Sequence, residues 1–401
     1  MKKTLAAIAV LGAFAGTALA ADVTLYGKID AGLNYTHTKT DGSAGTDDFS
    51  MKSAQNSGSR FGLKGTEQIS EDVTVGFQLE NGFNIDDGYM GQDDRLFGRE
   101  ARVYVKTGFG ELALGRMGGI DSGVGSYDLI ADANPFGTGW GDATGQMGNY
   151  FLGLTTRYDN MITYKSPEFA GITVVAQASL KKDSNGEGDE GSHLADRYYA
   201  IGMGADYGAL TGALTFSVQD YSGVKDRMEG AYPGVAVAED YNDDDGYAVT
   251  GFVAYDFGVT KVSLGAQYFD GVNQARGSLK PTLGFDEGPT YEYGDVAMGA
   301  TGYGVILGAI TPLAGGQLFT ALGYADYEQS KLFADEKAAG ADKADATSYG
   351  IGIGYQYPLS KRTYVYTAAS WNRLTENDGG VNDKDVDTDT TEVMAGIVHN
   401  F

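Results

Sequence analysis

The chain contains no cysteine and has only seven prolines, two tryptophans and three histidines among its 401 residues. The lack of cysteine means that the fold uses no disulfide bond, which is compatible with export to an oxidising compartment. Basic residues are also scarce, since 29 Lys and Arg face 54 Asp and Glu and the net charge is −25. A chain this acidic excludes nucleic acid as a natural partner.

Long apolar runs are missing from the body of the chain. Beyond residue 21 the longest stretch without strongly polar residues covers about 302–310, roughly half the length of a membrane-spanning helix. The sequence therefore predicts no transmembrane helix. In contrast, 61 glycines and 27 tyrosines are present, and this composition favours strands and tight turns over helices.

The first twenty residues have the pattern of a cleaved export signal. Lys2 and Lys3 precede an apolar run from Leu5 to Leu19, and the segment ends on Ala18-Leu19-Ala20. As a spanning helix the run is too short and is followed too soon by Asp22. We expect residues 1–20 to be removed, which changes the net charge from −25 to −27 because two lysines and no acids are lost. Residues 21–401 then form one domain.

Apolar and polar residues alternate along much of this domain. Near the start one parity carries apolar side chains and the other carries charge: Val23, Leu25, Ile29, Ala31, Leu33 and Tyr35 against Thr24, Tyr26, Lys28, Asp30 and Asn34. The last residues alternate in the same way up to Phe401, so the chain ends inside a strand. Such ribbons suit a wall between lipid and water, and only a closed barrel pairs every backbone amide in hydrocarbon.

This rule predicts an all-β fold, a transmembrane antiparallel barrel of sixteen strands. The strands are expected to begin near residues 22, 59, 72, 98, 110, 155, 171, 197, 211, 246, 259, 297, 316, 347, 362 and 391. Short turns alternate strictly with long loops, the latter spanning roughly 36–58, 84–96, 117–154, 182–195, 222–245, 271–295, 329–345 and 375–390. The short connections are predicted to be periplasmic and the long ones extracellular. A soluble β-sandwich is the alternative, but that fold does not explain why short and long connections alternate strictly.

Aromatic residues recur at the ends of the expected strands. Tyr35, Tyr357 and Phe401 are examples. Such rings prefer the boundary between lipid headgroups and hydrocarbon, so we expect these three to lie at the membrane interfaces of a bacterial outer membrane, in contact with lipid and lipopolysaccharide.

Several linked motifs resemble the general diffusion porins of Gram-negative bacteria. They are Ala21-Asp22-Val23-Thr24-Leu25-Tyr26-Gly27-Lys28-Ile29-Asp30, Ser59-Arg60-Phe61-Gly62-Leu63-Lys64-Gly65, Arg157-Tyr158-Asp159-Asn160, Tyr164-Lys165-Ser166-Pro167 and Gly396-Ile397-Val398-His399-Asn400-Phe401. The resemblance covers the whole mature chain. It implies a homotrimer of sixteen-stranded barrels, each with its own pore for passive diffusion of ions and small hydrophilic solutes, without a cofactor.

The resemblance also implies that the third long loop, residues 117–154, folds into the lumen and narrows it. Residues 128–137 are similar to the constriction segment of the family, although Asn134-Pro135-Phe136 replaces the usual Pro-Glu-Phe. Asp128 and Asp132 are therefore the expected pore-lining acids, with Asp142 as a third. Inward parity places Lys28, Arg60, Arg102 and Arg157 on the opposite wall, because an arginine facing lipid near the midplane would cost about 2–4 kcal/mol.

A basic wall facing an acidic loop would create a transverse field, which favours polar solutes over apolar ones. A porin that prefers one nutrient, such as a sugar, is the main alternative. Sugar channels need an aromatic track, and only scattered inward aromatics such as Tyr26, Tyr104 and Phe252 are present. A plugged adhesin barrel is a further alternative.

Two other chemistries find little support. Asp243-Asp244-Asp245 and the spaced Asp383, Asp385, Asp387 and Asp389 supply carboxylates for a hard cation, but the second set lacks the turn glycine and distal glutamate of a calcium loop. We interpret both as solvated outer loops and expect no metal site. An outer-membrane hydrolase would need a base near a nucleophile, and the histidines are His37, His193 and His399, two in loops and one facing outward. No catalytic residue is expected.

Overall fold

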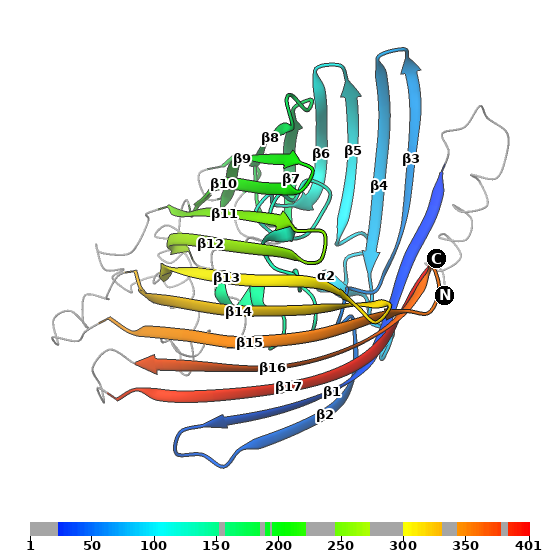
Figure 1. Ribbon diagram of the computed structural model, residues 1–401. Coiled ribbons are helices and arrows are strands. Elements are labelled where there is room, and N and C mark those ends of the chain that lie inside the picture. Colours follow the sequence, from blue (N-terminus) through cyan, green and yellow to red (C-terminus); the bar gives the residue numbers. More distant parts are fainter. Residues whose placement is uncertain are drawn as a thin grey trace.

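The computed structural model describes residues 23–151, 157–184, 189–192, 195–221, 245–272, 300–330, 343–377 and 384–401. Strands dominate this part of the chain (Figure 1). They are β1 (Thr24–Thr40), β2 (Thr46–Ser53), β3 (Arg60–Ser70), β4 (Val73–Gly82), β5 (Glu100–Thr107), β6 (Gly110–Gly118), β7 (Arg157–Lys165), β8 (Ile172–Ser179), β9 (Arg197–Tyr207), β10 (Leu210–Asp220), β11 (Gly246–Asp256), β12 (Lys261–Val272), β13 (Ala300–Leu313), β14 (Gly316–Gln329), β15 (Asp345–Pro358), β16 (Thr363–Asn377) and β17 (Val386–Asn400).

The helical elements are short. They are the turn α2 (Gly91–Asp94), whose Gln92 and Asp93 have positive φ, the 3-10 turn η1 (Ala131–Ala133) and the helix α3 (Gln146–Tyr150). Within the described residues no helix is long and apolar enough to cross a membrane.

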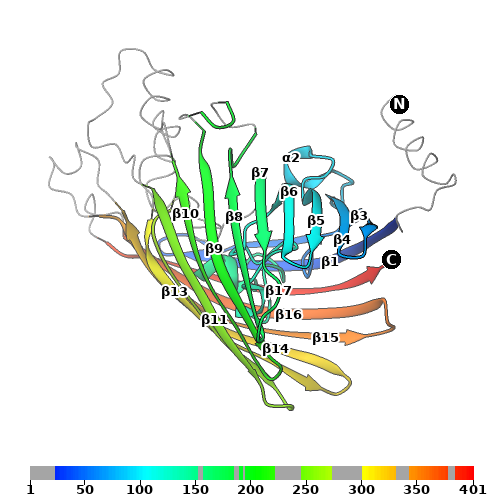
Figure 2. The same ribbon diagram turned by 90° about the horizontal axis from the view of Figure 1, so that it is seen from above.

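Consecutive antiparallel pairs close the sheet on itself. From β3 to β17 each strand pairs with the next one in the chain, β17 pairs with β1 from Lys28↔Asn400 to Thr40↔Thr388, and β1 returns to β3 from Thr24↔Lys64 to Lys28↔Arg60. The last residue takes part, since Phe401 and Gly27 exchange two backbone hydrogen bonds of 3.0 Å. From above, β17 lies beside β16 and β1 (Figure 2). The predicted closed barrel of sixteen strands, β1 and β3–β17, is confirmed.

The additional strand β2 lies where the sequence predicted only loop. It pairs with the far half of β1, from Ala31↔Ser53 to Thr38↔Thr46, while the near half of β1 pairs with β3. The segment 36–58 connects the barrel strands β1 and β3 as predicted, but residues 36–40 and 46–53 of it are strand. Likewise β16 extends to Asn377 and β17 begins at Val386, so the loop is shorter than the predicted range 375–390.

The wall has one apolar and one water-facing side, as the alternation predicted. On β13 the neighbours Ile306 and Leu307 are 0% and 46% exposed. Leu307 shares its cross-strand row with Leu264 and Leu322, which are 46% and 51% exposed. A row of half-exposed leucines across three strands is what lipid requires. The seven turns that follow β3, β5, β7, β9, β11, β13 and β15 are short and gather at one end of the barrel.

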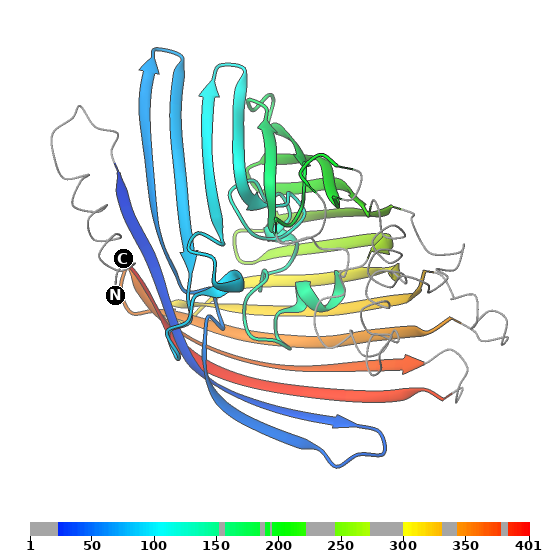
Figure 3. The same ribbon diagram turned by 180° about the vertical axis from the view of Figure 1, so that it is seen from behind.

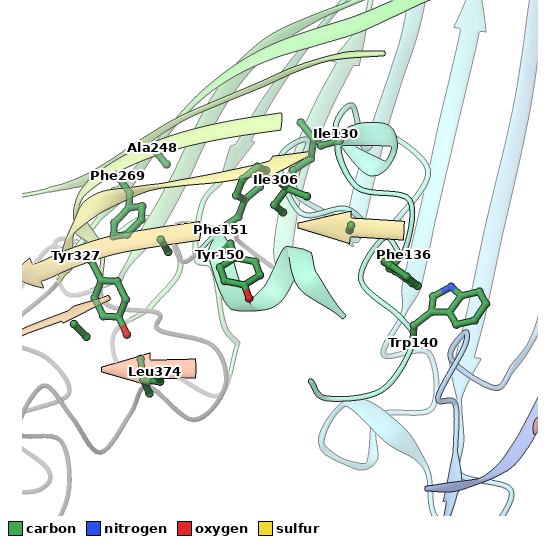
Figure 4. Packing of buried hydrophobic residues seen from close by; sticks show 14 of the residues in the cluster. Ile130, Phe136, Trp140, Tyr150, Phe151, Ala248, Phe269, Ile306, Tyr327 and Leu374 are labelled. Atoms are coloured by element: carbon green, nitrogen blue, oxygen red, sulfur yellow. The ribbon is translucent and has the colours of Figure 1, made fainter. Parts of the chain in front are cut away.

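The long segment between β6 and β7 folds to the inside (Figure 3). Its apolar side chains bury themselves against the inner face of β11–β17 and form the main core. Phe136 and Trp140 contact Phe319, and the Trp140 ring also meets Tyr366 at a centroid distance of 5.6 Å. Figure 4 shows this cluster with Tyr150 and Phe151 farther along the wall. The expected inward course of the third loop is present.

Glycine on the inner wall makes room for this loop. A Cβ at Gly323 would overlap the Tyr150 ring, and one at Gly304 would overlap the Tyr150 carbonyl. Part of the glycine surplus in the composition is thus explained by close approach between loop and wall. The predicted signal segment 1–20 lies outside the described residues.

Candidate constriction site

A cavity of about 650 Å³ lies between the third loop and the wall opposite its packed side. Three of the lining side chains are arginines, Arg60, Arg99 and Arg157, and two are wall carboxylates, Glu80 and Glu100. The loop contributes mainly backbone and small side chains, over residues 123–126 and 137–139. On one side of this cavity the barrel wall carries three arginines and two glutamates, and on the other side lies a glycine-rich surface of the loop.

The three arginines differ in how they are held. The Arg99 Nε donates to Glu80 Oε1 at 2.6 Å, whereas Arg60 Nε is 3.9 Å from Glu80 Oε2. Arg157 forms no ion pair within the described part of the chain, and its Nε has no hydrogen-bond partner there. Glu80 also accepts from the Tyr26 hydroxyl at 2.9 Å. The glutamate thus satisfies Arg99, whereas the guanidinium of Arg157, whose Nε is buried, has no carboxylate partner in the described chain.

The other two predicted basic residues take different positions. Lys28 Nζ donates to Ser57 Oγ at 3.2 Å, next to the cavity. Arg102 points inward but is covered by the start of the loop. It donates to Tyr127 Oη at 2.6 Å and to Gln78 Oε1 at 3.1 Å, and only 8% of its side chain is exposed. The inward direction predicted for Arg102 is present, but the side chain packs under the loop and does not line the cavity.

The three predicted loop acids lie in three separate places. Asp128 lines the arginine cavity. Asp132 is paired with Lys261 at 2.7 Å beside a smaller cavity, and Asp142 is paired with Lys52 at 2.8 Å in a third. The structure therefore does not gather the predicted acids opposite the arginines.

Asp128 is bound by its own loop. Its Oδ1 accepts from the Gly123 amide and its Oδ2 from the Ala131 amide, both at 2.7 Å. Burial nevertheless raises the pKa of this carboxyl to about 7 despite these two backbone hydrogen bonds. The side chain shapes the turn and carries a charge that depends on pH near neutrality.

Two wall carboxylates hold the loop in place. Glu100 accepts from the Ser126 amide at 2.9 Å and from the Ser126 hydroxyl at 2.7 Å. Glu392, on β17, is fully buried, and one of its oxygens accepts from the amides of Ala143 and Thr144 at 2.9 and 2.8 Å. Its other oxygen accepts from Asn34 Nδ2 at 2.9 Å and from the Asp142 amide at 3.2 Å. Carboxylates facing backbone N–H groups form strong, directional anchors.

Sequence reasoning missed Arg99, Glu80, Glu100 and Glu392. Glu80 has inward parity and follows four apolar residues of β4 on the opposite face, so the alternation alone could have placed this acid in the lumen. Arg99 precedes β5 by one residue, where strand parity gives no guidance. Glu392 pairs with a segment 248 residues earlier in the chain, a contact that spacing does not reveal.

The predicted interface aromatics all point outward. Tyr35, Tyr357 and Phe401 are 39%, 43% and 44% exposed. The Tyr35 hydroxyl donates to Asp47 Oδ1 at 2.7 Å. The ring of Phe401 lies over Gly27, where a Cβ would collide with it.

The carboxylates and histidines singled out by the sequence pair with side chains close to them. No group of three or more His, Cys, Asp or Glu side chains in the described part of the chain is arranged to hold a metal ion. Asp387 and Asp389 pair with Arg373 at 3.2 and 2.8 Å, His37 with Asp47 at 2.8 Å, and His399 with the Thr363 hydroxyl at 2.9 Å. Asp243, Asp244, Asp383 and His193 lie outside the described residues.

The chain is similar to known channel proteins throughout its length. Residues 5–380 match the sequence profile of the Gram-negative porin family. An outer membrane porin protein of Bordetella pertussis is 32% identical, with all of both chains covered. Among solved structures, the anion-selective porin from Comamonas acidovorans is 24% identical with a TM-score of 0.62 over 95% of this chain and 100% of the other. The trimer form of OmpT from Vibrio cholerae is 14% identical with a TM-score of 0.54 over 95% and 100%.

Proposed function

Because this chain belongs to the Gram-negative porin family and forms an outer-membrane channel for passive diffusion, we propose that it is a general porin whose filter is the arginine cavity. One observation carries the proposal. The third loop packs inside the closed barrel and leaves a cavity of about 650 Å³ beside Arg60, Arg99 and Arg157. Ions and small hydrophilic solutes cross at this point.

The same cavity supports a preference for anions, although the chain carries a net charge of −25. The narrowest ring dominates selectivity, because charges at wide, exposed rims are screened within about 8–10 Å at physiological salt. Arg157 has no ion pair in the described chain, and Arg60 has one only at 3.9 Å. The similar fold of the anion-selective Comamonas porin agrees with this view.

A zero-current potential measurement tests the filter. Purified protein in a planar bilayer under a tenfold KCl gradient is compared with Arg60→Gln plus Arg157→Gln, and the double variant should shift clearly toward cation preference. Lys106→Gln is the matched control, since Lys106 is exposed near the short-turn end of β5. An equal shift in control and double variant, or no shift in either, contradicts the assignment.

The outer surface near the long loops supports a homotrimer. The second edge of β2 pairs with no described strand, and Phe49 and Met51 on its outward face are 70% and 62% exposed. Tyr89 in the next loop is 69% exposed. Exposed apolar side chains beside a free strand edge are typical of an interface between subunits, and OmpT of Vibrio cholerae has a trimer form.

Light scattering in detergent checks the assembly. The wild-type mass should be three times that of the chain, and Phe49→Asp plus Met51→Asp should lower it to one chain. Val393→Asp is a control for an acid placed on the lipid-facing wall, where Val393 is 46% exposed. A monomeric wild type would refute the trimer.

The half-exposed rings of Tyr35, Tyr357 and Phe401 support direct contact with lipid, including lipopolysaccharide on the outer side. Replacing Tyr357 and Phe401 with alanine should reduce the resistance of the folded barrel to urea in vesicles. An unchanged urea concentration at the midpoint of unfolding would show that these rings do not stabilise the barrel at the membrane interface.

A further inference from the structure

A second polar cavity, of about 380 Å³, lies on the long-loop side of the third loop. Its lining comes from the inner faces of β1, β2, β15, β16 and β17 and from the loop residues Asp142, Ala143 and Asn149. The volume falls within the usual range of small-molecule sites, about 300–1,000 Å³.

Three threonine hydroxyls that have no partner among the described residues face this cavity. Thr38 and Thr390 are direct cross-strand neighbours, and Thr390 in turn faces Asn372. The side chains of Thr36, Thr38 and Thr390 form no hydrogen bond to any described residue. Neighbouring strands are about 4.8 Å apart, so these groups form a short row in which each hydroxyl both donates and accepts.

The two cations that line the cavity, Lys52 and Arg373, are already paired, Arg373 with Asp387 and Asp389 at 3.2 and 2.8 Å. Lys52 and Asp142 form an ion pair of 2.8 Å, and Glu392 is saturated by the loop amides and Asn34. Asp48 Oδ2 accepts from the Ser50 hydroxyl at 3.0 Å. An anion would therefore have to displace a carboxylate from Lys52 or Arg373. A neutral molecule with several hydroxyl groups only has to match donors and acceptors that are free.

We infer that this cavity is a transit site for small neutral polyhydroxylated solutes, of monosaccharide size, upstream of the arginine cavity. The inference rests on the channel function and adds a saturable step to diffusion. No aromatic ring is present among the lining residues, so stacking does not contribute and binding is expected in the millimolar range.

Glucose titration of the ion current tests the site. In planar bilayers glucose should lower the single-channel conductance beyond the viscosity effect, and this excess should saturate. Trimethylglycine at equal viscosity, a zwitterion without hydroxyl groups, should give the viscosity effect alone. Equal effects of the two solutes, or saturation by trimethylglycine, overturn the inference on the wild-type protein itself.

Substitutions then locate the site. Thr38→Val plus Thr390→Val keeps the side-chain shape and removes two hydroxyls, and should lower the excess block by glucose at least threefold relative to each channel's own sugar-free conductance. Thr24→Val plus Thr74→Val is the matched control, with the same change at the short-turn end of the lumen. An unchanged excess block in the first pair refutes the location. A channel that keeps its ion preference but shows no excess block refutes this inference and leaves the proposed filter intact.

Discussion

Asp128 shows how one side chain couples the loop to pH. Its pKa is raised by burial from 3.8 to about 7, so the folded protein keeps a proton that the unfolded chain releases near pH 4. Stability therefore falls as pH rises from about 4 to about 7, and above this window a negative charge stands beside the arginines. We predict that anion preference is greater at pH 6 than at pH 8.

The zero-current potential of wild type and Asp128→Asn, measured at both pH values, decides this prediction. The zero-current potential of Asp128→Asn should be the same at pH 6 and pH 8, because its side-chain amide does not titrate. A pH shift of equal size in the variant would assign the effect to another group.

Glu392 is the second residue with a specific role, because it fixes the far end of the loop to β17. In Glu392→Gln one acceptor oxygen becomes an NH₂ group that faces backbone amides. Each hydrogen bond to a charged group contributes about 1.5–3 kcal/mol, so the loop should loosen, with larger current fluctuations and a higher mean conductance. Glu328→Gln removes an exposed carboxylate paired with Lys343 at 2.8 Å and serves as control.

Single-channel recordings of the two variants give the comparison. Identical current variance in Glu392→Gln and wild type would mean that packing of the aromatic residues alone holds the loop.

The side of the barrel wall that a strand residue faces was predictable from the sequence. Which loop residues come close to one another was not. The parity of Arg60 and Arg157 followed from the cost of a charge in lipid, whereas Asp128, Asp132 and Asp142 lie in an irregular loop whose path is set by packing on distant strands. Alternation carries no information about such contacts.

At the scale of elements, strand positions agreed closely with prediction because lipid and water impose opposite preferences on successive residues. The strand β2 was missed although Phe49 and Met51 alternate with Asp48, Ser50 and Lys52. Its flanks, rich in Gly, Ser and Asp, have the composition of a loop, and that composition outweighed an eight-residue pattern.

The two tryptophans can be used to test which residues lie inside the barrel and which face lipid. Trp140 is 4% exposed in the loop core, whereas Trp371 lies in the row of the outward-facing Ile351 on β15. With Trp140→Phe, excitation at a wavelength that tyrosine does not absorb reports on Trp371 alone, and brominated lipids should quench most of its emission. With Trp371→Phe only Trp140 remains, and quenching should be slight. Equal quenching of both variants would mean that the loop is not inside the barrel.

At the scale of the whole molecule, closure and an occupied lumen depend on each other. The sheet leaves no unpaired edge between β3 and β17 or between β17 and β1, and the third loop packs against its inner face on glycines such as Gly323. Closure was predictable from the even strand count and the terminal strand. The size and charge of the remaining passage were not predictable, because they depend on how far the loop extends across the lumen.

The most direct test of a passage narrowed by this loop uses the absence of native cysteine. Ser126→Cys places a single thiol in the arginine cavity, and Ser43→Cys places one in the exposed turn between β1 and β2. After reaction with an anionic methanethiosulfonate, confirmed by mass spectrometry, the single-channel conductance of Ser126→Cys should fall in clear steps while that of Ser43→Cys stays constant. Full conductance of a completely labelled Ser126→Cys channel would contradict the account.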